Sequence, residues 1–178
     1  YPVEIFACNF NDGMGPADLE APIKKFNSFA DKRGWTEYSA WTLMKYYGGG
    51  AQDFDFLWVG VSPSATALGR MQDQWVAEGS KVQAAFDEVS PCGAHANFAS
   101  LTMQQPPERT IDKLVVSFSD CNMGDGMLFG DVYPAIDEWA KYRKEHGSKA
   151  GMWVWFPAYG DGESDFDFKL ITAYGNLE

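Results

Sequence analysis

The chain repeats itself over a long period. A segment that begins at Cys8 (Cys-Asn-Phe-Asn-Asp-Gly-Met) returns at Cys121 (Cys-Asn-Met-Gly-Asp-Gly-Met), 113 residues later (121 − 8). Further matches follow at an offset of 112, and they pair Trp41 with Trp153, Tyr47 with Tyr159, and the Asp-Phe-Asp-Phe run at 53–56 with the one at 165–168. Self-similarity at a fixed long period is the signature of a repeated structural unit. We therefore interpret the chain as an internal duplication.

The sequence pattern of the first repeat predicts the element order β-α-β-β-α-β. Strand-forming runs lie at 3–10, 37–47, 54–61 and 97–103, with a helix between Pro16 and Gly34 and a helical region over 68–86 that is kinked near Gly79. The second repeat predicts strands at 114–120, 150–159 and 165–174 and a helix at 131–146, and then it stops. We expect domains at 1–103 and 113–178, the second of them incomplete, joined by a linker at 104–112.

This order is that of the ferredoxin-like motif, whose helices cover one face of its sheet. Both faces of the predicted strands are nevertheless apolar or aromatic, as where Trp41 and Leu43 alternate with Thr42 and Met44. A strand that is apolar on both faces is covered on both faces. The expected fold class is α+β, with two ferredoxin-like repeats packed sheet to sheet as a single dimeric α/β-barrel-like domain.

The element order and the duplication resemble the dimeric α/β-barrel superfamily in its tandem, fused form. Members of that superfamily include small antibiotic-type monooxygenases, haem-degrading enzymes and chlorite dismutases. The chain also resembles uncharacterised secreted marine-bacterial proteins through its Cys-Asn start, its Asp-Phe-Asp-Phe strand, and the pair Cys92 and His95. Neither resemblance supplies a catalytic signature, and a shared fold does not transfer function.

Charge and composition exclude several classes of partner. The net charge of −11 argues against nucleic acid, because phosphate binding needs a basic face. No run of about 18 apolar residues is present, so we expect no membrane span. The chain begins Tyr1-Pro2-Val3 without an initiator Met, which we interpret as the result of a cleaved secretion signal, with trimming as the alternative. The expected location is periplasmic or secreted.

Two of the three cysteines are expected to form a disulfide. The ferredoxin-like strand order is 4-1-3-2, and strand 4 runs antiparallel to strand 1. The end of strand 1, at Cys8, therefore lies beside the start of strand 4, just after Cys92, within reach of a disulfide. Cys121 is the counterpart of Cys8 in a repeat that has no fourth strand, so we expect it to be unpaired. A disulfide agrees with an oxidising compartment.

Seven residues are candidates for a ligand-binding site. Asn9 and Asn122 lie in the equivalent loops before the first helix of each repeat, where free N–H groups bind anions, although turn chemistry alone would explain them. His95 is a candidate axial haem ligand, or a hydrogen-bonded residue at the start of a strand. The other candidates are aromatic residues that either line a cavity or form ordinary core, namely Trp41, Trp153, Tyr47 and Tyr159. Trp58 and Trp155 belong to the same set of strand aromatics.

No metal site is expected. Cys92 and His95 supply two ligands, whereas zinc takes four, or three and a water. The acidic stretch at 161–167 has carboxylates at alternate positions but lacks the Gly and the final Glu of a calcium-binding EF-hand loop. His146 falls at a helix C-terminus, where the dipole favours a cation, and we interpret it as structural.

The leading functional hypothesis is a secreted or periplasmic, non-enzymatic binding or structural protein with an aromatic-lined interior. One alternative is an α/β-barrel enzyme of the monooxygenase-like or haem-binding kind. Another is a subunit of a larger extracellular assembly, because an incomplete second repeat leaves a sheet edge for a partner. A small apolar or aromatic ligand and a homo-oligomer are the partners considered, and no cofactor is assigned. The sequence leaves open whether the protein is an enzyme.

Overall fold

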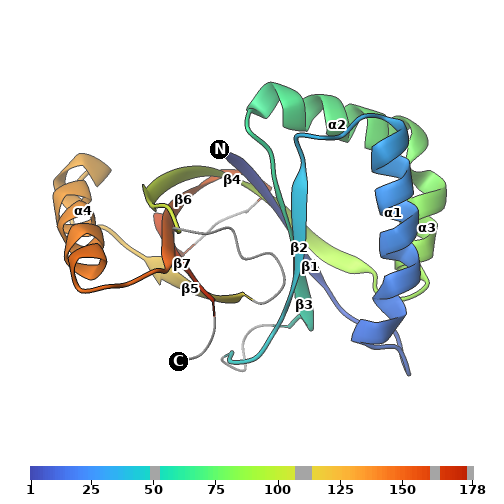
Figure 1. Cartoon of the computed structure of the whole chain (residues 1–178), viewed down its shortest axis with the longest axis horizontal. Helices are drawn as coiled ribbons and strands as arrows, with labels where there is room; N and C mark the ends of the chain where they lie inside the picture. The colour runs from blue at the N-terminus through green and yellow to red at the C-terminus, as the bar shows by residue number, and fades with distance from the viewer. Residues whose placement is uncertain (49–52, 107–113, 161–164, 176–178) are drawn as a thin grey trace. The chain divides into compact units, whose positions relative to one another are not determined.

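Two units make up the chain in the computed structural model (Figure 1), Tyr1–Asn97 and Phe98–Glu178. The structure describes residues 1–48, 53–106, 114–160 and 165–175. Most of the expected linker at 104–112, and part of the acidic stretch at 161–167, lie outside these described residues. The division falls inside a strand, β4 (Cys92–Gln104), whose first residues belong to the first unit and whose remainder belongs to the second.

The first unit is a four-stranded antiparallel sheet with its helices on one face (Figure 1). Its strand order, β2-β3-β1-β4, is the predicted 4-1-3-2 order of the ferredoxin-like motif. The elements, in chain order, are β1 (Pro2–Cys8), the 3-10 turn η1 (Pro16–Leu19), α1 (Glu20–Lys32), β2 (Ser39–Met44), β3 (Phe56–Val61), α2 (Ala65–Glu78), α3 (Ser80–Asp87) and the start of β4.

Local sequence explains where these helices begin and end. Pro16 opens the first helical turn, where its missing N–H costs nothing, and the Asp18 carboxylate accepts a hydrogen bond from the Gly15 N–H at 2.8 Å. α1 ends before Gly34, which has a φ of +67°. The helical region expected over 68–86 is divided at Gly79 into α2 and α3, which agrees with the kink predicted there.

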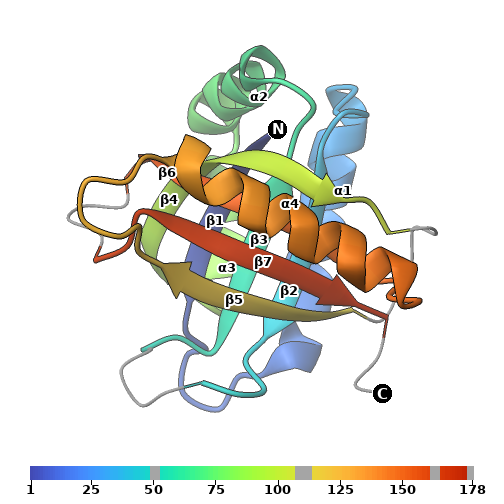
Figure 2. The ribbon, with the colours of Figure 1, turned by 90° about the vertical axis from the view of Figure 1, so that its left-hand side faces the viewer.

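The second unit contains β5 (Val115–Cys121), α4 (Phe129–Glu145), β6 (Gly151–Tyr159) and β7 (Phe168–Tyr174), with the end of β4 beside β6 in the order β4-β6-β7-β5 (Figure 2). Its register repeats that of the first unit. Cys8 lies opposite Phe56 across β1 and β3, and Cys121 lies opposite Phe168 across β5 and β7. The same sheet scaffold therefore carries both halves of the sequence match.

The matched loops after β1 and β5 are held by the same hydrogen bonds. The Asp55 carboxylate accepts from the Phe10 N–H at 2.8 Å, and the Asp167 carboxylate accepts from the Met123 N–H at 2.7 Å. The backbone N–H of Asp55 donates to the carbonyl oxygen of Cys8, and that of Asp167 donates to the carbonyl oxygen of Cys121. The alternating Asp-Phe runs thus anchor the first loop of each unit, and the interpretation of these loops as turn chemistry has a direct physical basis.

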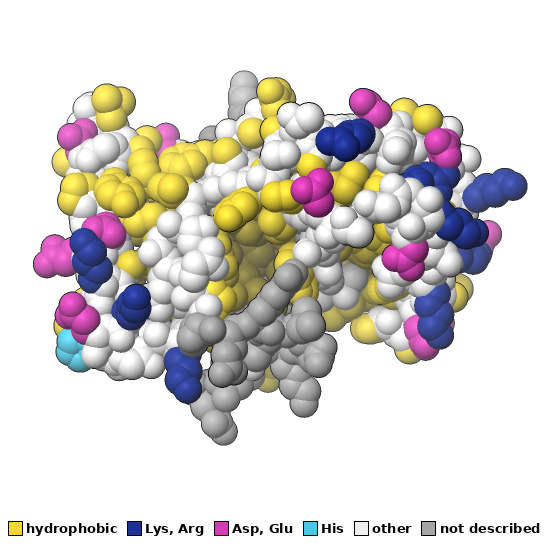
Figure 3. All heavy atoms as spheres, turned by 45° about the horizontal axis from the view of Figure 1, so that its top comes forward, with side chains coloured by type: hydrophobic (Ala, Val, Ile, Leu, Met, Phe, Trp, Pro, Cys, Tyr) yellow, Lys and Arg dark blue, Asp and Glu magenta, His cyan; other side chains and the backbone are white. Residues whose placement is uncertain are grey.

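Helix α4 carries aromatic side chains that are not covered within its own unit. Trp139 and Tyr142 are about half exposed, and their rings stack in line with that of His146. Hydrophobic side chains gather over the part of the second unit that contains α4 (Figure 3). Single exposed aromatics are ordinary on a protein surface, whereas a group of them needs an explanation.

The predicted disulfide is confirmed. Cys8 and Cys92 are bonded across β1 and β4, and Cys121 is a free thiol. Their Cα atoms lie 3.9 Å apart, which is closer than the expected range of roughly 4.4–6.8 Å. Strand order predicted that Cys8 and Cys92 lie side by side, and their Cα atoms are closer than this prediction needed. No helix among the described residues is long and apolar enough to cross a bilayer.

Candidate functional site

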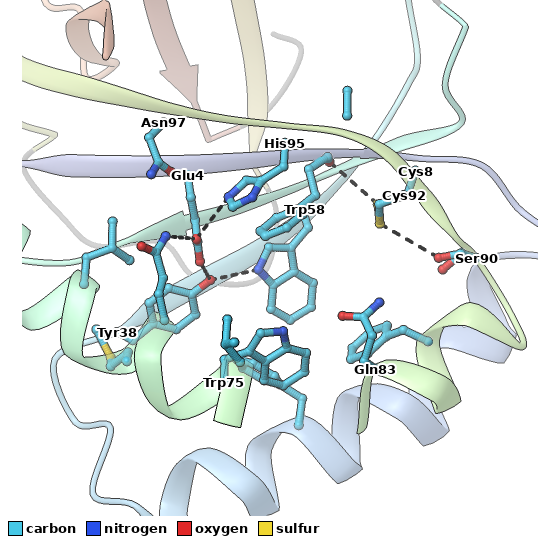
Figure 4. Close-up of a pocket in the computed structure, with 18 of the residues that line it drawn as sticks. Glu4, Cys8, Tyr38, Trp58, Trp75, Gln83, Ser90, Cys92, His95 and Asn97 are labelled. Carbon is cyan, nitrogen blue, oxygen red and sulfur yellow. Dashed lines mark hydrogen bonds and ion pairs between the residues drawn. A yellow bond between two sulfur atoms is a disulfide. The ribbon is translucent and has the colours of Figure 1, made fainter. Parts of the chain in front are cut away.

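A cavity of about 530 Å³ lies within the first unit (Figure 4). Side chains from β1, β3 and β4 form one wall, and side chains from α1, α2 and α3 form the other. Aromatic side chains form a large part of the lining, with Phe26, Trp35, Trp58, Trp75 and Phe86 among them. Ligand sites in proteins are typically concave and apolar with a few placed polar groups, and this cavity has that composition.

The sheet wall follows from the alternation of side chains along each strand. Glu4, Phe6 and Cys8 project from one face of β1, since successive side chains point to opposite faces. Trp58 lies opposite Phe6 in the register and so shares that face. The Phe6 ring stacks on the ring of His95 from β4, with centroids 3.8 Å apart. Sheet and side-chain geometry together present Glu4 and His95 to the same cavity.

Glu4 is the polar centre of the cavity wall. Its residue surface is 7% exposed, and its carboxylate accepts hydrogen bonds from the Tyr38 hydroxyl at 2.7 Å and the Gln72 amide at 2.9 Å. Nε2 of His95 lies 3.4 Å from the same carboxylate. The Trp58 indole N–H donates to the Tyr38 oxygen at 2.9 Å, so a chain of donors converges on one buried acid. Buried charges of this kind persist only when they are hydrogen-bonded.

These contacts keep Glu4 ionised and Tyr38 protonated. Burial by itself raises the pKa of Glu4, but hydrogen bonds from His95, Tyr38 and Gln72, with the charge of His95, outweigh burial and hold the pKa below its ordinary value of 4.5. Burial, followed by the adjacent Glu4 charge, raises the pKa of Tyr38 well above 10.0. The pair is therefore a carboxylate with a neutral phenol as its donor.

A glycine makes room for the Tyr38 hydroxyl. Gly60 lies directly opposite Glu4 in the pairing of β1 with β3. A Cβ atom at position 60 would come within 2.1 Å of the Tyr38 hydroxyl oxygen, which is far inside van der Waals contact. Any larger residue would push the ring away from its place over the strand. Gly60 is thus required by the Tyr38–Glu4 hydrogen bond rather than by backbone conformation.

Two polar atoms in the cavity lining are buried without a hydrogen-bond partner among the described residues. They are Oδ1 of Asn97, two residues after His95 on β4, and Oγ of Ser90. Leaving a buried acceptor unpaired costs roughly 1–3 kcal/mol. The disulfide between Cys8 and Cys92 also lines this cavity, so a covalent bond joins the strands that carry Glu4 and His95.

The candidate residues from the sequence are not brought together. His95 lines the cavity. Trp41 lies opposite Val59 on β3, and alternation places it on the sheet face away from Trp58. Tyr47 and Tyr159 are 83% and 77% exposed. The Asn9 amide donates to the backbone carbonyl of Asp53 at 3.2 Å, Asn122 is exposed, and Trp153 lies on β6 over Gly151 in the second unit.

The sequence reasoning missed Glu4, Tyr38 and Gln72. A signal for Glu4 was present, because a charged residue inside the apolar strand Val3–Phe6 must be exposed or paired. Tyr38 precedes β2 and Gln72 lies on α2, so only the packing of helix against sheet brings them to Glu4. Among the described residues, no group of three or more His, Cys, Asp or Glu is arranged to hold a metal ion.

The fold is that of known solved structures. A crystal structure provisionally described as a chlorite dismutase matches with a TM-score of 0.57 and 11% identity, over 99% of this chain and 80% of that one. A double mutant of chlorite dismutase from Candidatus Nitrospira defluvii matches with a TM-score of 0.59 and 8% identity, over 99% of this chain and 77% of that one. The same enzyme in complex with imidazole gives a TM-score of 0.55, 10% identity and the same coverage.

No family model and no curated protein sequence matches this chain. At 8–11% identity the likeness to the solved structures concerns the fold alone. It confirms the predicted α+β class of the ferredoxin-like, dimeric α/β-barrel kind.

Proposed function

We propose that the protein is an α/β-barrel enzyme that binds a small, mostly apolar molecule in the first-unit cavity and transfers a proton to or from it through His95. The observation that carries this proposal is the pairing of His95 with a buried, ionised Glu4 at the wall of an aromatic cavity. Histidine is the most common acid–base residue in enzymes. A carboxylate on one ring nitrogen fixes the orientation of the ring.

The roles of the two residues follow from their surroundings. The lowered pKa of Glu4 makes it a weak proton acceptor at neutral pH, and three donors already surround its carboxylate. The side chain of His95 is 43% exposed and lines the cavity, so a bound molecule can reach it. His95 is therefore the acid–base group, and Glu4 is the residue that positions it.

The likeness to chlorite dismutases supports an enzyme over a protein that only binds a ligand. It also raises the question of haem, one of the alternatives from the sequence. The cavity does not suit that group. Nε2 of His95 faces Glu4 and its ring is stacked on Phe6, so the nitrogen that usually takes a metal is engaged with a carboxylate. No Lys or Arg is among the described cavity residues to pair with two propionates.

The second histidine does not provide a haem pocket either. Nδ1 of His146 lies 2.8 Å from the Tyr142 carbonyl oxygen, at the exposed C-terminal end of α4. Its ring is stacked on Tyr142 at 3.9 Å. A haem site needs an enclosed apolar pocket around its axial ligand, whereas His146 lies at an exposed helix end. The proposed reaction therefore uses side chains of the chain itself.

The test uses phenylacetone, an apolar aromatic ketone with exchangeable α-protons. Binding is measured first, by quenching of tryptophan fluorescence, because Trp35, Trp58 and Trp75 line the cavity. Exchange of the α-protons for deuterium in D2O is then followed by NMR, for wild-type protein and for His95→Gln. We expect exchange to be faster with wild type by about 10²-fold or more. Equal exchange rates with ligand bound to both proteins would contradict a proton-transfer role for His95.

The location of the protein also remains a proposal. We propose a periplasmic or secreted protein, and the disulfide between Cys8 and Cys92 supports this because such bonds persist in oxidising compartments. Trapping of free thiols in intact cells should find one reactive cysteine per chain, and three would contradict the proposal. Self-association is likewise a prediction, for which light scattering of the purified protein is the measurement.

A further inference from the structure

We propose that the molecule bound in the first-unit cavity is an organic cation, a protonated amine attached to an aromatic or other apolar body. This inference rests on the proposed function, because it names the class of molecule that the same cavity takes. Three features of the cavity support it independently: the sign of its charge, the faces of its aromatic rings, and a buried acceptor without a donor.

The charge of the cavity wall favours a cation. Glu4 is the one acid among the described lining residues, and no Lys or Arg accompanies it. Two of the side-chain partners of Glu4, Tyr38 and Gln72, carry no charge. When the third partner, His95, is also neutral, the wall carries one negative charge. A ligand carboxylate or phosphate placed there would be repelled at short range in a medium of low dielectric constant. An ammonium group would be attracted by the same field.

The aromatic lining reinforces this preference. Ring faces carry negative electrostatic potential, and indole is the strongest cation binder of the protein side chains. Trp35, Trp58 and Trp75 line the cavity together with Phe26, which lies 5.0–6.0 Å from all three by ring centroid. A cavity lined by several aromatic rings and one carboxylate has the composition that binds alkylammonium groups.

An unpaired acceptor marks where the donor of the ligand would lie. Oδ1 of Asn97 is buried in the cavity lining with no donor among the described residues. Asn97 is two residues from His95 on β4, so both side chains project from the same face of the strand. An ammonium group has three N–H donors. One of them placed on Asn97 Oδ1 would restore the missing hydrogen bond.

The net charge of the chain acts in the same direction at longer range. A charge of −11 raises the local concentration of cations around the protein and lowers that of anions. This contribution is screened by salt, whereas the contribution of a buried carboxylate is screened much less. The two can therefore be separated by experiment.

The test compares three ligands of similar size and different charge: 2-phenylethylamine, 2-phenylethanol and phenylacetate. Their affinities for the wild-type protein are measured by fluorescence quenching and calorimetry in low and physiological salt. We expect the amine to bind on the order of tenfold more tightly than the alcohol, and the anion more weakly than both. The preference for the amine over the alcohol should persist in physiological salt.

Two variants locate the source of the preference. Glu4→Gln removes the buried charge, and Glu20→Gln removes an exposed charge on α1 that pairs with Lys24, so both change the net charge equally. We expect Glu4→Gln to reduce the preference for the amine several-fold and Glu20→Gln to leave it unchanged. Thermal unfolding shows whether each variant is folded. If Glu4→Gln does not fold, Asn97→Leu replaces it and should weaken the amine more than the alcohol.

The outcomes separate the two proposals. If none of the three ligands nor phenylacetone binds, the cavity is not a ligand site and the proposed function fails with it. If the alcohol and the ketone bind as tightly as the amine, the cavity is a ligand site and the inference of a cation is wrong. If the amine preference disappears in physiological salt, long-range charge is its source. If the preference is as large in Glu4→Gln as in wild type, the aromatic rings are its source. Either result overturns the assigned role of Glu4.

Discussion

The two units share a scaffold, but among the described residues the buried acid and its donors are found in the first unit. Equivalent register positions carry Glu4 opposite Gly60 in the first unit and Ser117 opposite Thr172 in the second. Trp58, opposite Phe6, corresponds to Leu170, opposite Ser119. Within the second unit these positions therefore offer hydroxyl and aliphatic groups, with Ser117 exposed, in place of a buried acid and its donors.

The first helices differ in the same way. Phe26 and Phe29 of α1 are 9% and 7% exposed, whereas Trp139 and Tyr142, which occupy the matching positions on α4, are 50% and 51% exposed. In the first unit α2 and α3 cover these rings, and Phe26 contacts Trp75 and Phe86 from those helices. The described part of the second unit has no such cover. A cavity thus needs both the sheet face and the second helical layer.

The comparison shows that the residues that maintain the fold differ from the residues that form the candidate site. Hydrogen bonds from Asp55 and Asp167 fix the same loop in both units, and Gly13 and Gly126 both have positive φ there. The residues that hold the loop conformation are therefore present in both units. The residues that surround Glu4 are described in the first unit alone.

The largest expected effect concerns the cysteines. Replacing Cys8 and Cys92 by Ala removes a bond that closes a long loop, with a sequence separation of 84. The chain-entropy model predicts a loss of about 4.5 kcal/mol in the free energy of unfolding. Cys121→Ala, at the matching position of the second unit, should change it by less than about 0.5 kcal/mol. Urea unfolding of both variants measures the difference, and equal losses would contradict the asymmetry between the units.

The next largest effect concerns the matched helical rings. Phe26→Ala leaves a cavity among Trp35, Trp58, Trp75 and Phe86 and should cost about 3–5 kcal/mol. Trp139→Ala removes a half-exposed ring and should cost about 1 kcal/mol or less. Thermal unfolding compares the two. A large loss with Trp139→Ala would mean that the second-unit helix is covered in the native protein.

A smaller effect is expected at the glycine under Tyr38. Gly60→Ala should cost about 1–3 kcal/mol, because the new methyl group displaces the Tyr38 hydroxyl. Thr172→Gly, at the same position of the second unit, introduces no clash and creates no tyrosine contact. The measurement is the ultraviolet titration of tyrosine, in which Tyr38 should ionise at lower pH in Gly60→Ala than in wild type. An unchanged titration would show that Tyr38 does not depend on this glycine.

The smallest effect is the acid dependence of stability. Because the pKa of Glu4 is lowered in the folded state, its ionised form favours folding. That contribution is fully present above the unfolded value of about 4.5 and is lost as the pH falls through the lower folded value. In Glu4→Gln the free energy of unfolding should therefore decrease less steeply than in wild type as the pH is lowered below 5. A slope equal to that of wild type would place the acid sensitivity elsewhere.

The strands, helices and loops could be predicted from the sequence because they depend on local patterns of residues. Strand alternation, the glycines of the loops and the position of Cys8 before a turn all follow from near neighbours in the chain. The disulfide followed from strand order, which the element order determines. The strand alternation, the loop glycines and the cysteine that ends the first strand occur in both halves, so each half of the sequence corroborates the other.

The site could not be predicted in the same way. Glu4 reads as a charge in a strand, and nothing near it in sequence supplies a partner. Tyr38 is 34 residues away and Gln72 is 68 residues away. The repeated tryptophans Trp41 and Trp153 are strand residues that do not line the cavity. Trp58 and Trp75, which line the cavity, have no repeated tryptophan partner.

The disulfide in the cavity wall has a consequence for how the protein matures. Before oxidation, β1 and β4 are held only by their ladder, and a slip of one residue would turn His95 to the opposite face of the sheet, away from Glu4. The bond between Cys8 and Cys92 fixes that register. The bond therefore holds the acid and the imidazole on the same face of the sheet.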